Sequence, residues 1–342
     1  MKVAIDASPL NSGHSVRGIG SYTQKLIENL KTVPGIELIQ FDNGHIPSAD
    51  VTHYPYFDLF FHTLPVAKKQ KRIVTIHDVI PLIFPNRFPS GIKGYISLFF
   101  QKRGLKNTDF VICDSKTSKN DISDKLSIPK ERIEVIYLAA SESFKKIDDV
   151  KRLKSVKRKL KLPQNFALYV GDVNWNKNLE NLINSIKISK VPLVMVGAAL
   201  VDNKVPQTQA LERLIKRLNL EDKIVKTGFV EEEDLVSIYN LAGVTILPSF
   251  YEGFGLPVLE SMACGTPVVC SSNSSLAEIA GNLARFCDPQ NPADIAKKTL
   301  RVLNMSKKAK ESLSRKLTAH ASTFSWQKTA KQTINVYKKV LG

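Results

Sequence analysis

The sequence predicts an α/β protein built from two doubly wound parallel-sheet domains that face each other across a cleft. Its 342 residues are about twice the length of a typical domain. Short apolar segments alternate with helical segments in both halves, the pattern of parallel sheets covered by helices on both faces. The alternation stops once, at a polar and basic stretch over residues 145–161 followed by Pro163, and then restarts. Ligands of such sheets bind at the carboxyl ends of the strands.

In the first half, six short apolar segments have the length and composition of buried strands. They lie at residues 3–7, 37–41, 51–54, 72–76, 110–113 and 133–136. The first strand is followed by a glycine-containing loop and a helix with apolar residues at helical spacing, namely Tyr22, Leu26, Ile27 and Leu30. Two more helices are predicted at residues 91–104 and 116–126. The first domain is therefore expected to span residues 1–160.

In the second half the same pattern predicts five strands and four helices before a helical finish. The strands lie at residues 167–171, 192–197, 224–227, 244–248 and 267–270. The helices lie at residues 178–188, 207–219, 232–241 and 257–264. We expect the second domain to span residues 161–325.

The net charge of +17 is distributed unevenly. Residues 145–161 carry +7 and residues 297–342 carry +11, so the rest of the chain is nearly neutral. A protein coated with nucleic acid is expected to be basic throughout its binding face, with arginines and aromatic residues interleaved. The two basic segments contain mostly lysines, so a nucleic-acid partner is not predicted.

The four cysteines are scattered and form no Cys-x-x-Cys pair. A chain of this length folds without disulfides, so reduced thiols and a cytoplasmic location are expected. The histidines do not fall at ligand spacing, and no metal site is predicted. No apolar run approaches the roughly 18 residues that a transmembrane helix needs, and the apolar segment after Met1 is too short for a signal peptide.

The densest motif joins a strand end, a glycine loop and a helix start, over residues 249–260. Gly253 and Gly255 permit a tight turn and a close approach of ligand to backbone, and Pro257 suits the first helical turn. Backbone amides at the start of this helix form an anion site suited to a diphosphate. Glu252 and Glu260 flank it, and each carboxylate is able to accept hydrogen bonds from a sugar diol. The motif therefore predicts a sugar-nucleotide site.

This string, with Ala-Cys-Gly-Thr-Pro-Val-Val downstream, closely resembles the Glu-x7-Glu signature of retaining GT-B glycosyltransferases of the GT4 type, also called glycosyltransferase group 1. The resemblance covers nearly the whole chain. It implies GT-B architecture with two Rossmann-like domains, acceptor binding by residues 1–160 and nucleotide-sugar binding by residues 161–325. Residues 326–342 resemble the terminal helix that crosses back to the first domain.

The resemblance also implies roles for individual residues in the second domain. Lys177, six residues after Gly171, matches the phosphate-binding lysine, whose ammonium offsets charge on the departing diphosphate without a metal ion. Glu252 orients the donor sugar, Glu260 holds the ribose, and Gly253, Phe254, Gly255 and Leu256 line the donor site. Many members carry an arginine where this chain has Asp172 or Asn176, so the second cation of the phosphate clamp is missing from both positions.

In the first domain Gly18 matches the loop that approaches the donor phosphate, and His77 matches the histidine beside the donor sugar. Asp78 is a weaker candidate for binding the acceptor. His53 occupies a similar strand end, and for this residue a functional role and a structural role are equally open. Thr23 stands where a dinucleotide-binding Gly-x-Gly-x-x-Gly loop needs its third glycine, which argues against a nicotinamide cofactor. No cofactor is predicted.

The predicted function is transfer of a hexose, with mannose and glucose as candidates, from a nucleoside-diphosphate sugar to a glycan or lipid-linked acceptor in polysaccharide biosynthesis. The resemblance implies a metal-independent reaction that retains the anomeric configuration without an established covalent intermediate. The alternative is a GT-B-fold sugar-nucleotide epimerase, which consumes no acceptor. The sequence does not specify the donor sugar, the base or the acceptor.

One helical segment raises a question about membrane contact. Residues 92–103 combine a large apolar face with basic ends, and Lys68, Lys69, Lys71 and Arg72 lie nearby in sequence. An apolar face of this kind is more often part of a core. The alternative is a helix that lies on an anionic membrane, which would place the enzyme at the inner membrane face.

Overall fold

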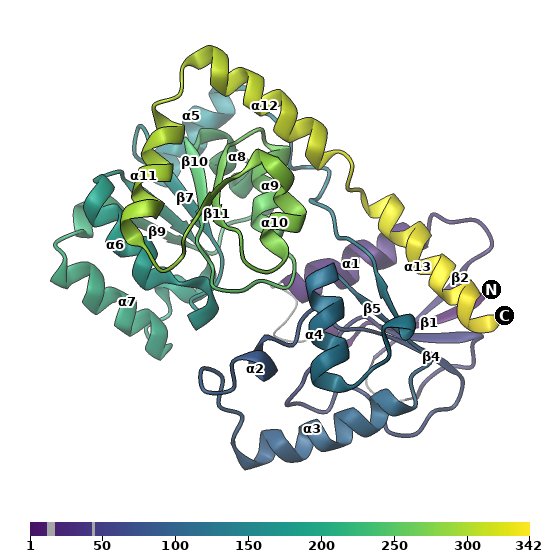
Figure 1. Ribbon diagram of the computed structural model, residues 1–342. Helices are drawn as coiled ribbons and strands as arrows, with labels where there is room; N and C mark the ends of the chain where they lie inside the picture. Colours follow the sequence, from purple (N-terminus) through teal and green to yellow (C-terminus); the bar gives the residue numbers. More distant parts are fainter. Residues whose placement is uncertain (12–17, 43–44) are drawn as a thin grey trace. The chain divides into compact units, whose positions relative to one another are not determined.

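The computed structural model describes residues 1–11, 18–42 and 45–342 (Figure 1). The chain forms two compact units, one made of Met1–Ala139 with Phe324–Gly342 and the other of Ala140–Thr323. We call them unit 1 and unit 2. Residues 140–160, which the sequence-based division assigned to the first domain, pack within unit 2. Each unit contains one parallel six-stranded sheet, as the α/β prediction requires.

The sheet of unit 1 has the strand order β2-β1-β3-β4-β5-β6. The strands are β1 (Lys2–Asp6), β2 (Glu37–Phe41), β3 (Val51–Tyr54), β4 (Lys71–Thr75), β5 (Phe110–Cys113) and β6 (Ile133–Val135). The helices are α1 (Gly18–Leu30), α2 (Ile80–Ile83), α3 (Gly91–Lys106), α4 (Lys116–Leu126) and α13 (Trp326–Leu341). All six predicted strands are present, and the apolar residues predicted for the first helix, Tyr22, Leu26, Ile27 and Leu30, are buried in α1.

The C-terminal helix α13 packs beside α1 and against β4 and β5 (Figure 1). A buried polar chain fixes it there: the Tyr337 hydroxyl lies 2.7 Å from Nδ1 of His53, and Nε2 of His53 lies 2.8 Å from Oγ1 of Thr75. Both His53 and Tyr337 are fully buried. Burial, helped by the nearby charge of His77, lowers the pKa of His53 to about 3, so its ring is neutral. His53 is therefore a satisfied core residue of unit 1.

Replacing Tyr337 with phenylalanine removes one hydroxyl and leaves Nδ1 of buried His53 without this partner. We expect the free energy of unfolding to fall by about 1 to 3 kcal/mol, the cost of an unsatisfied buried polar group. Chemical denaturation measures the change, and Tyr95→Phe is the matched control because Tyr95 is exposed. Equal stability of the two variants would show that the His53 bond contributes nothing.

The sheet of unit 2 has the strand order β12-β11-β10-β7-β8-β9. The strands are β7 (Ala167–Val170), β8 (Leu193–Val196), β9 (Ile224–Gly228), β10 (Val244–Leu247), β11 (Val268–Ser271) and β12 (Arg285–Cys287). The helices are α5 (Val150–Lys159), α6 (Leu179–Ser189), α7 (Pro206–Arg217), α8 (Glu232–Leu241), α9 (Leu256–Ala263), α10 (Ser275–Ala280), α11 (Pro292–Leu303) and α12 (Lys307–Ala321). The prediction of a purely helical finish was wrong, because β12 pairs with β11 at the sheet edge. Strand β12 begins with the exposed Arg285 and contains only two apolar residues, Phe286 and Cys287, so it does not stand out as a buried apolar run.

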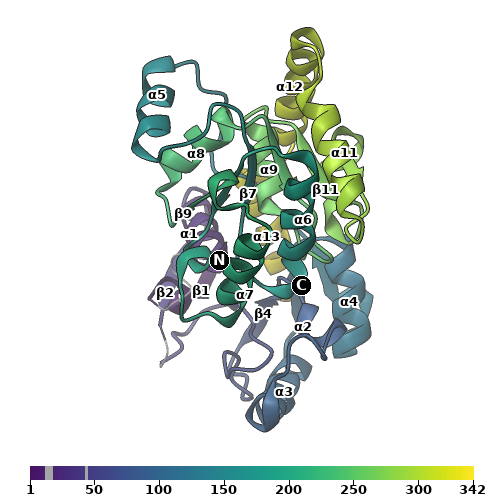
Figure 2. The same ribbon diagram turned by 90° about the vertical axis from the view of Figure 1, so that its left-hand side faces the viewer.

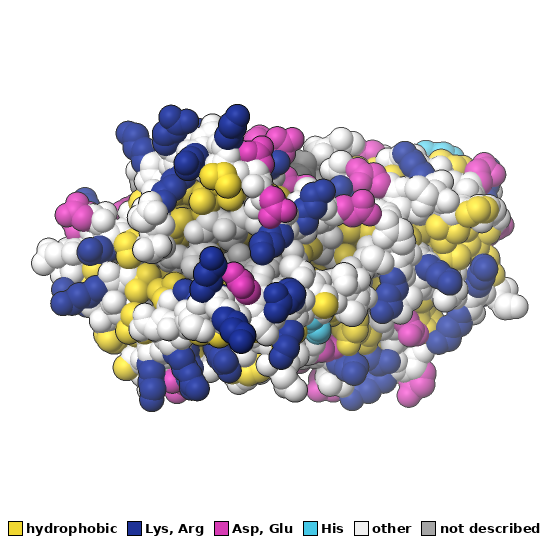
Figure 3. Space-filling model, turned by 90° about the horizontal axis from the view of Figure 1, so that it is seen from above, with side chains coloured by type: hydrophobic (Ala, Val, Ile, Leu, Met, Phe, Trp, Pro, Cys, Tyr) yellow, Lys and Arg dark blue, Asp and Glu magenta, His cyan; other side chains and the backbone are white. Residues whose placement is uncertain are grey.

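The basic stretch before Pro163 is partly neutralised inside unit 2. Helix α5 packs on α8, whose first turn is acidic. Lys159 forms an ion pair with Asp234 at 2.7 Å, and Nη2 of Arg152 donates to the Glu233 carbonyl at 2.7 Å. In the view from above, Lys and Arg side chains are interrupted by acidic and apolar ones (Figure 3). The positive charge of α5 is thus partly offset by the acidic first turn of α8.

Candidate active site

The glycine loop of unit 2 leads directly into α9. Gly255 has a φ of +102°, and a Cβ at this position would lie 2.5 Å from Cδ2 of Leu276. Only glycine therefore fits without strain. Pro257 lies in the first turn of α9, and Gly265, with a φ of +73°, ends the helix, both as predicted. The loop is further held by Oγ of Ser275, which donates to the carbonyls of Glu252 and Phe254.

The structure brings Lys177 and Glu252 into direct contact. Nζ of Lys177 lies 2.8 and 2.9 Å from the two carboxylate oxygens of Glu252. Oγ of Ser249 donates to Oε1 of Glu252 at 2.7 Å, and the Glu252 amide donates to Oγ of Ser274 at 2.9 Å. The side chains are 18% and 9% exposed, so one flank of the pair still faces solvent. A charge pair with an open side can exchange this contact for a ligand.

Asparagines tie the loop that carries Lys177 to the loop that carries Glu252. The Phe250 amide donates to the Asn176 carbonyl at 2.8 Å, and Nδ2 of Asn176 returns a bond to the Tyr251 carbonyl at 3.0 Å. Nδ2 of Asn178 donates to the Pro248 and Pro289 carbonyls, and the rings of Trp175 and Phe250 stack 5.0 Å apart. The position of the Lys177–Glu252 pair is therefore set by backbone contacts around it.

Asp172 and Asn176, the two positions at which the resemblance leads us to expect an arginine, serve local structure here. Oδ1 of Asp172 accepts from the Val173 amide at 2.7 Å, and the Asp172 carbonyl accepts from the Tyr169 hydroxyl at 2.6 Å. Asn176 is buried and joins the two loops. Lys177 therefore lies beside the Glu252 carboxylate, and neither Asp172 nor Asn176 supplies a second cation.

Glu260 lies on α9 and contacts α8 rather than Glu252. Its Oε2 accepts a hydrogen bond of 2.7 Å from the hydroxyl of Tyr239, which is fully buried. Burial raises the pKa of Glu260 to about 7; the Tyr239 bond opposes this shift and the charge of Glu232 adds to it. The sequence did not mark Tyr239 as functional, since an aromatic residue inside a helix is typical of a core.

In unit 1, His77 follows β4 and contacts Asp114, which follows the neighbouring β5. Nδ1 of His77 lies 2.7 Å from Oδ2 of Asp114, and its Nε2 lies 3.2 Å from the Pro55 carbonyl. Burial favours the neutral ring, but the charge of Asp114 and its hydrogen bond outweigh this and raise the pKa of His77. Both ring nitrogens face acceptors, which suits an imidazolium.

Sequence reasoning missed Asp114, although its position after a buried strand was a usable signal. Its carboxylate is buried, and Oδ1 has no hydrogen-bond partner among the described residues. Asp78, the weaker candidate, uses Oδ1 to accept the Ile80 amide at 3.0 Å. The two acids at this edge therefore differ, because Asp114 positions His77 and Asp78 shapes the following turn.

Gly18 is the exposed first residue of α1. A Cβ at this position would meet none of the described residues within 4 Å, so packing among them does not require glycine here. Gly13 and Arg17, which the sequence placed in the same loop, lie outside the described residues.

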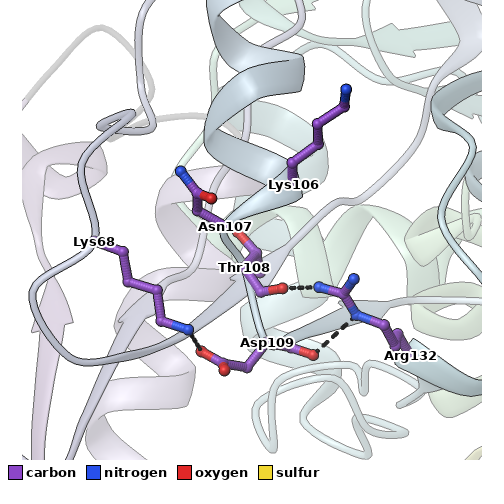
Figure 4. A pocket seen from close by; sticks show the side chains of 6 residues that line it. All are labelled: Lys68, Lys106, Asn107, Thr108, Asp109 and Arg132. Atoms are coloured by element: carbon purple, nitrogen blue, oxygen red, sulfur yellow. Dashed lines mark hydrogen bonds and ion pairs between the residues drawn. The ribbon is translucent and has the colours of Figure 1, made fainter.

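A pocket of about 550 Å³ lies at the opposite edge of the unit 1 sheet (Figure 4). It is lined by Lys68, Lys106, Asn107, Thr108, Asp109 and Arg132. Asp109 and Arg132 precede β5 and β6, so this pocket is at the amino ends of the strands, whereas His77 is at the carboxyl ends. None of the predicted site residues lines it.

Two searches of the described residues bear on other kinds of site. No helix there is both long and apolar enough to cross a membrane. Within the same residues, no group of three or more His, Cys, Asp or Glu side chains is arranged to hold a metal ion.

Comparison with known proteins places the fold and these motifs in one family. Residues 150–320 match the family described as "Glycosyl transferases group 1", and residues 35–141 match "Glycosyltransferase Family 4". The chain belongs to the group 1 glycosyltransferases, and it has the GT-B fold. It is an enzyme that transfers sugars.

Individual relatives agree with this assignment. The chain is 30% identical to O-antigen chain mannosyltransferase B of Escherichia coli over 275 residues, which cover 79% of this chain and 70% of that protein. Among solved structures, a sucrose-phosphate synthase from Thermosynechococcus elongatus has a TM-score of 0.77 at 19% identity, with 99% of each chain covered. Anabaena Alr3699/HepE, solved in complex with UDP and glucose, has a TM-score of 0.75 at 17% identity, also with 99% of each covered. These two structures support the fold alone.

Proposed function

We propose that the protein is a retaining, metal-independent hexosyltransferase that uses a nucleoside-diphosphate sugar and a glycan or lipid-linked acceptor. The Lys177–Glu252 pair beside the start of α9 carries this proposal. Mannose is the first donor sugar to test, because O-antigen chain mannosyltransferase B is among the relatives. The acceptor class follows from the same relative, and acceptor binding is assigned to unit 1.

The diphosphate is proposed to bind between Lys177 and the amides of Gly253–Leu256. Departure of the nucleotide builds negative charge on the diphosphate, and a fixed ammonium together with backbone N–H groups stabilises it. In the free protein the ammonium is neutralised by Glu252. When the donor binds, the diphosphate replaces this contact and leaves the Glu252 carboxylate free to accept hydrogen bonds from the sugar hydroxyls. The Lys177–Glu252 ion pair is thus replaced by two contacts, one between Lys177 and the diphosphate and one between Glu252 and the sugar.

The remaining predicted residues are proposed to position the donor. Glu260 accepts hydrogen bonds from the ribose diol, and Phe254 and Leu256 shape the loop. A role for the Gly18 backbone at the donor phosphate is proposed from the motif that carries it. His77 is proposed to act on the donor sugar as a positioning cation rather than as a proton acceptor, because Asp114 and the Pro55 carbonyl occupy both of its ring nitrogens. It is therefore not poised to act as a base.

A binding and turnover screen tests the proposal. UDP, GDP and ADP and their glucose and mannose derivatives are added to the protein, and thermal unfolding is followed. We expect one base to stabilise the fold, by about 2.7 kcal/mol at a ligand concentration 100 times Kd. The stabilising sugar nucleotide is then incubated with glycan and lipid-linked acceptors, and NMR of the product is expected to show the donor's anomeric configuration. Conversion of the donor without any acceptor would instead identify an epimerase.

A further inference from the structure

Helix α3 exposes the large apolar side chains that a soluble core would bury. Ile92 is 81% exposed, Tyr95 65% and Phe99 53%, and Ile96 and Phe100 are exposed as well. The expectation that this helix face belongs to the core was therefore wrong, because the face is exposed within unit 1. Figures 1 and 2 both show α3 along the outer side of unit 1, with no other described helix beyond it. Exposed apolar side chains in such a group mark an interaction surface.

These side chains form a continuous stripe along α3. Residues 92, 95, 96, 99 and 100 recur at spacings of three and four, so they share one side of the helix. The same spacing continues to Arg103 and Lys106, which are also exposed. We call these seven residues, five apolar and two basic, the α3 stripe. Lys93 and Lys102 lie about 100° and 80° from its centre on opposite sides, at 100° of rotation per residue, so a lysine flanks the stripe on each side.

The opposite side of α3 is anchored and fixes which way the stripe points. Oε1 of buried Gln101 accepts the Leu64 amide at 3.0 Å, and its Nε2 donates to Oγ1 of Thr63 at 2.8 Å. Gly104 packs on Leu64: a Cβ there would lie 3.1 Å from Leu64 carbons. Turning the helix to bury the stripe would expose Gln101 and break these bonds. The exposure of the stripe is therefore a property of the packed structure.

The charged residues of α3 all have one sign. Helix α3 contains Lys93, Lys102, Arg103 and Lys106 and no Asp or Glu. The Arg103 guanidinium lies 4.6 Å from the centre of the Phe99 ring, so this cation sits directly over the apolar surface. At its C-terminal end, Lys106 lines the pocket of Figure 4, where Lys68 and Arg132 add positive charge and Asp109 is held by Lys68 at 2.6 Å. A partner for this surface needs an apolar interior and a negative face.

We propose that the α3 stripe docks unit 1 onto an anionic lipid bilayer. An interfacial helix places aromatic and aliphatic side chains in the acyl boundary and flanking lysines at the headgroups, which is the arrangement along α3. A second copy of the chain is a poor occupant, because it would bring two basic helices together. This inference rests on α3 and its pocket alone and does not require the proposed transferase activity. Helix α3 begins on the side of the sheet where β4 ends and His77 lies.

Vesicle flotation of the full chain tests the docking. Vesicles of phosphatidylcholine alone, and with about a third phosphatidylglycerol, are compared at low and high salt. We expect flotation with the anionic vesicles at low salt and a loss of binding at high salt. Lys93→Gln/Lys102→Gln is expected to weaken binding by about 30-fold, from two lysines near the surface. Ile96→Ser/Phe99→Ser is expected to abolish flotation.

Matched variants separate docking from general effects. Ile188→Ser removes an apolar side chain as exposed as Phe99, at 53%, from unit 2, and Lys151→Gln/Lys154→Gln removes two exposed lysines of α5. Both are expected to float like the unaltered protein, and all variants are expected to melt at its temperature because the replaced side chains are exposed. Failure of the unaltered protein to float at low salt, equal loss in the matched variants, or a dimer that Ile96→Ser/Phe99→Ser dissociates would each overturn the proposal. Nucleotide-induced thermal stabilisation is measured in parallel, so docking and donor binding fail or succeed separately.

Discussion

Replacing Lys177 with methionine is expected to lower the rate of sugar transfer by about 100- to 1,000-fold, the effect of removing one preorganised group that stabilises developing negative charge. Methionine keeps the length and apolar stem of the side chain but removes the ammonium that lies 2.8 Å from Glu252. The diphosphate then departs with the loop amides alone to stabilise it. Steady-state kinetics with the donor identified in the binding screen measure the loss, which we expect mainly in kcat.

The same variant is expected to destabilise the protein, which makes a further control necessary. Removing Lys177 leaves the Glu252 carboxylate, 9% exposed, without its cation. Breaking a buried pair costs about 3 to 5 kcal/mol, and this partly open pair is expected near or below the lower value. The double variant Lys177→Met/Glu252→Gln removes both charges, so it should regain most of the stability without regaining activity. Lys187→Met serves as the matched control, because Lys187 is exposed and its ammonium donates to the Leu218 carbonyl, without an ion pair to any described residue.

The double variant distinguishes a catalytic pair from a structural one. If the ion pair only supports the fold, activity and stability recover together when both charges are removed. If Lys177 stabilises the diphosphate, stability recovers alone. Near-normal transfer by the double variant would therefore remove Lys177 and Glu252 from the proposed active site, even if the family assignment stands.

Local patterns in the sequence were sufficient for most of the fold. The strands at residues 51–54 and 110–113 have the predicted ends, because buried parallel strands are bounded sharply by polar or turn residues. The edge strand at residues 37–41 and the helix at residues 116–126 have the predicted ends as well. The edge strand β12 was missed because it begins with the exposed Arg285 and has only two apolar residues. The apolar face of α3 was expected to be part of the core but is exposed in unit 1. A pattern of apolar residues shows which side of a helix is apolar but not what covers that side.

The candidate site was predictable as a set of residues but not as a set of contacts. The Glu-x7-Glu string and Lys177 were identified from their resemblance to family motifs, whereas the ion pair between Lys177 and Glu252 depends on two loops 75 residues apart in the chain. The partner of His77, Asp114, comes from the neighbouring strand, and the partner of Glu260, Tyr239, comes from the preceding helix. Such partners are set by tertiary packing, and these contacts determine the charge of each group.

Glu260→Gln is the second variant with a large expected effect, and its sign depends on pH. Burial raises the pKa of Glu260 to about 7, so the folded protein holds this proton more tightly than the unfolded chain. Stability is therefore lost as pH rises from the ordinary glutamate value through about 7, because the carboxylate must ionise where it is poorly solvated. Glutamine cannot ionise and keeps an oxygen for the Tyr239 hydroxyl. At pH 8 we expect the variant to be more stable than the unaltered protein by at most about 3 kcal/mol, with the difference absent near pH 4.

Donor affinity is expected to change in the opposite direction. The ionised carboxylate accepts strong hydrogen bonds from the ribose diol, so affinity for a nucleoside-diphosphate sugar should rise with pH through about 7 in the unaltered protein. Glu260→Gln should bind about 10- to 100-fold more weakly at pH 8, the value of a charged hydrogen bond, and should lack this rise. Calorimetric titration of both proteins with donor between pH 6 and 8.5 measures this difference in affinity. Any contribution of His77 cancels in the comparison, because both proteins retain it. Exposed Glu221→Gln is the control. A variant that is more stable at high pH yet binds donor normally would leave Glu260 as a buried structural acid, and the ribose would then be held by other residues.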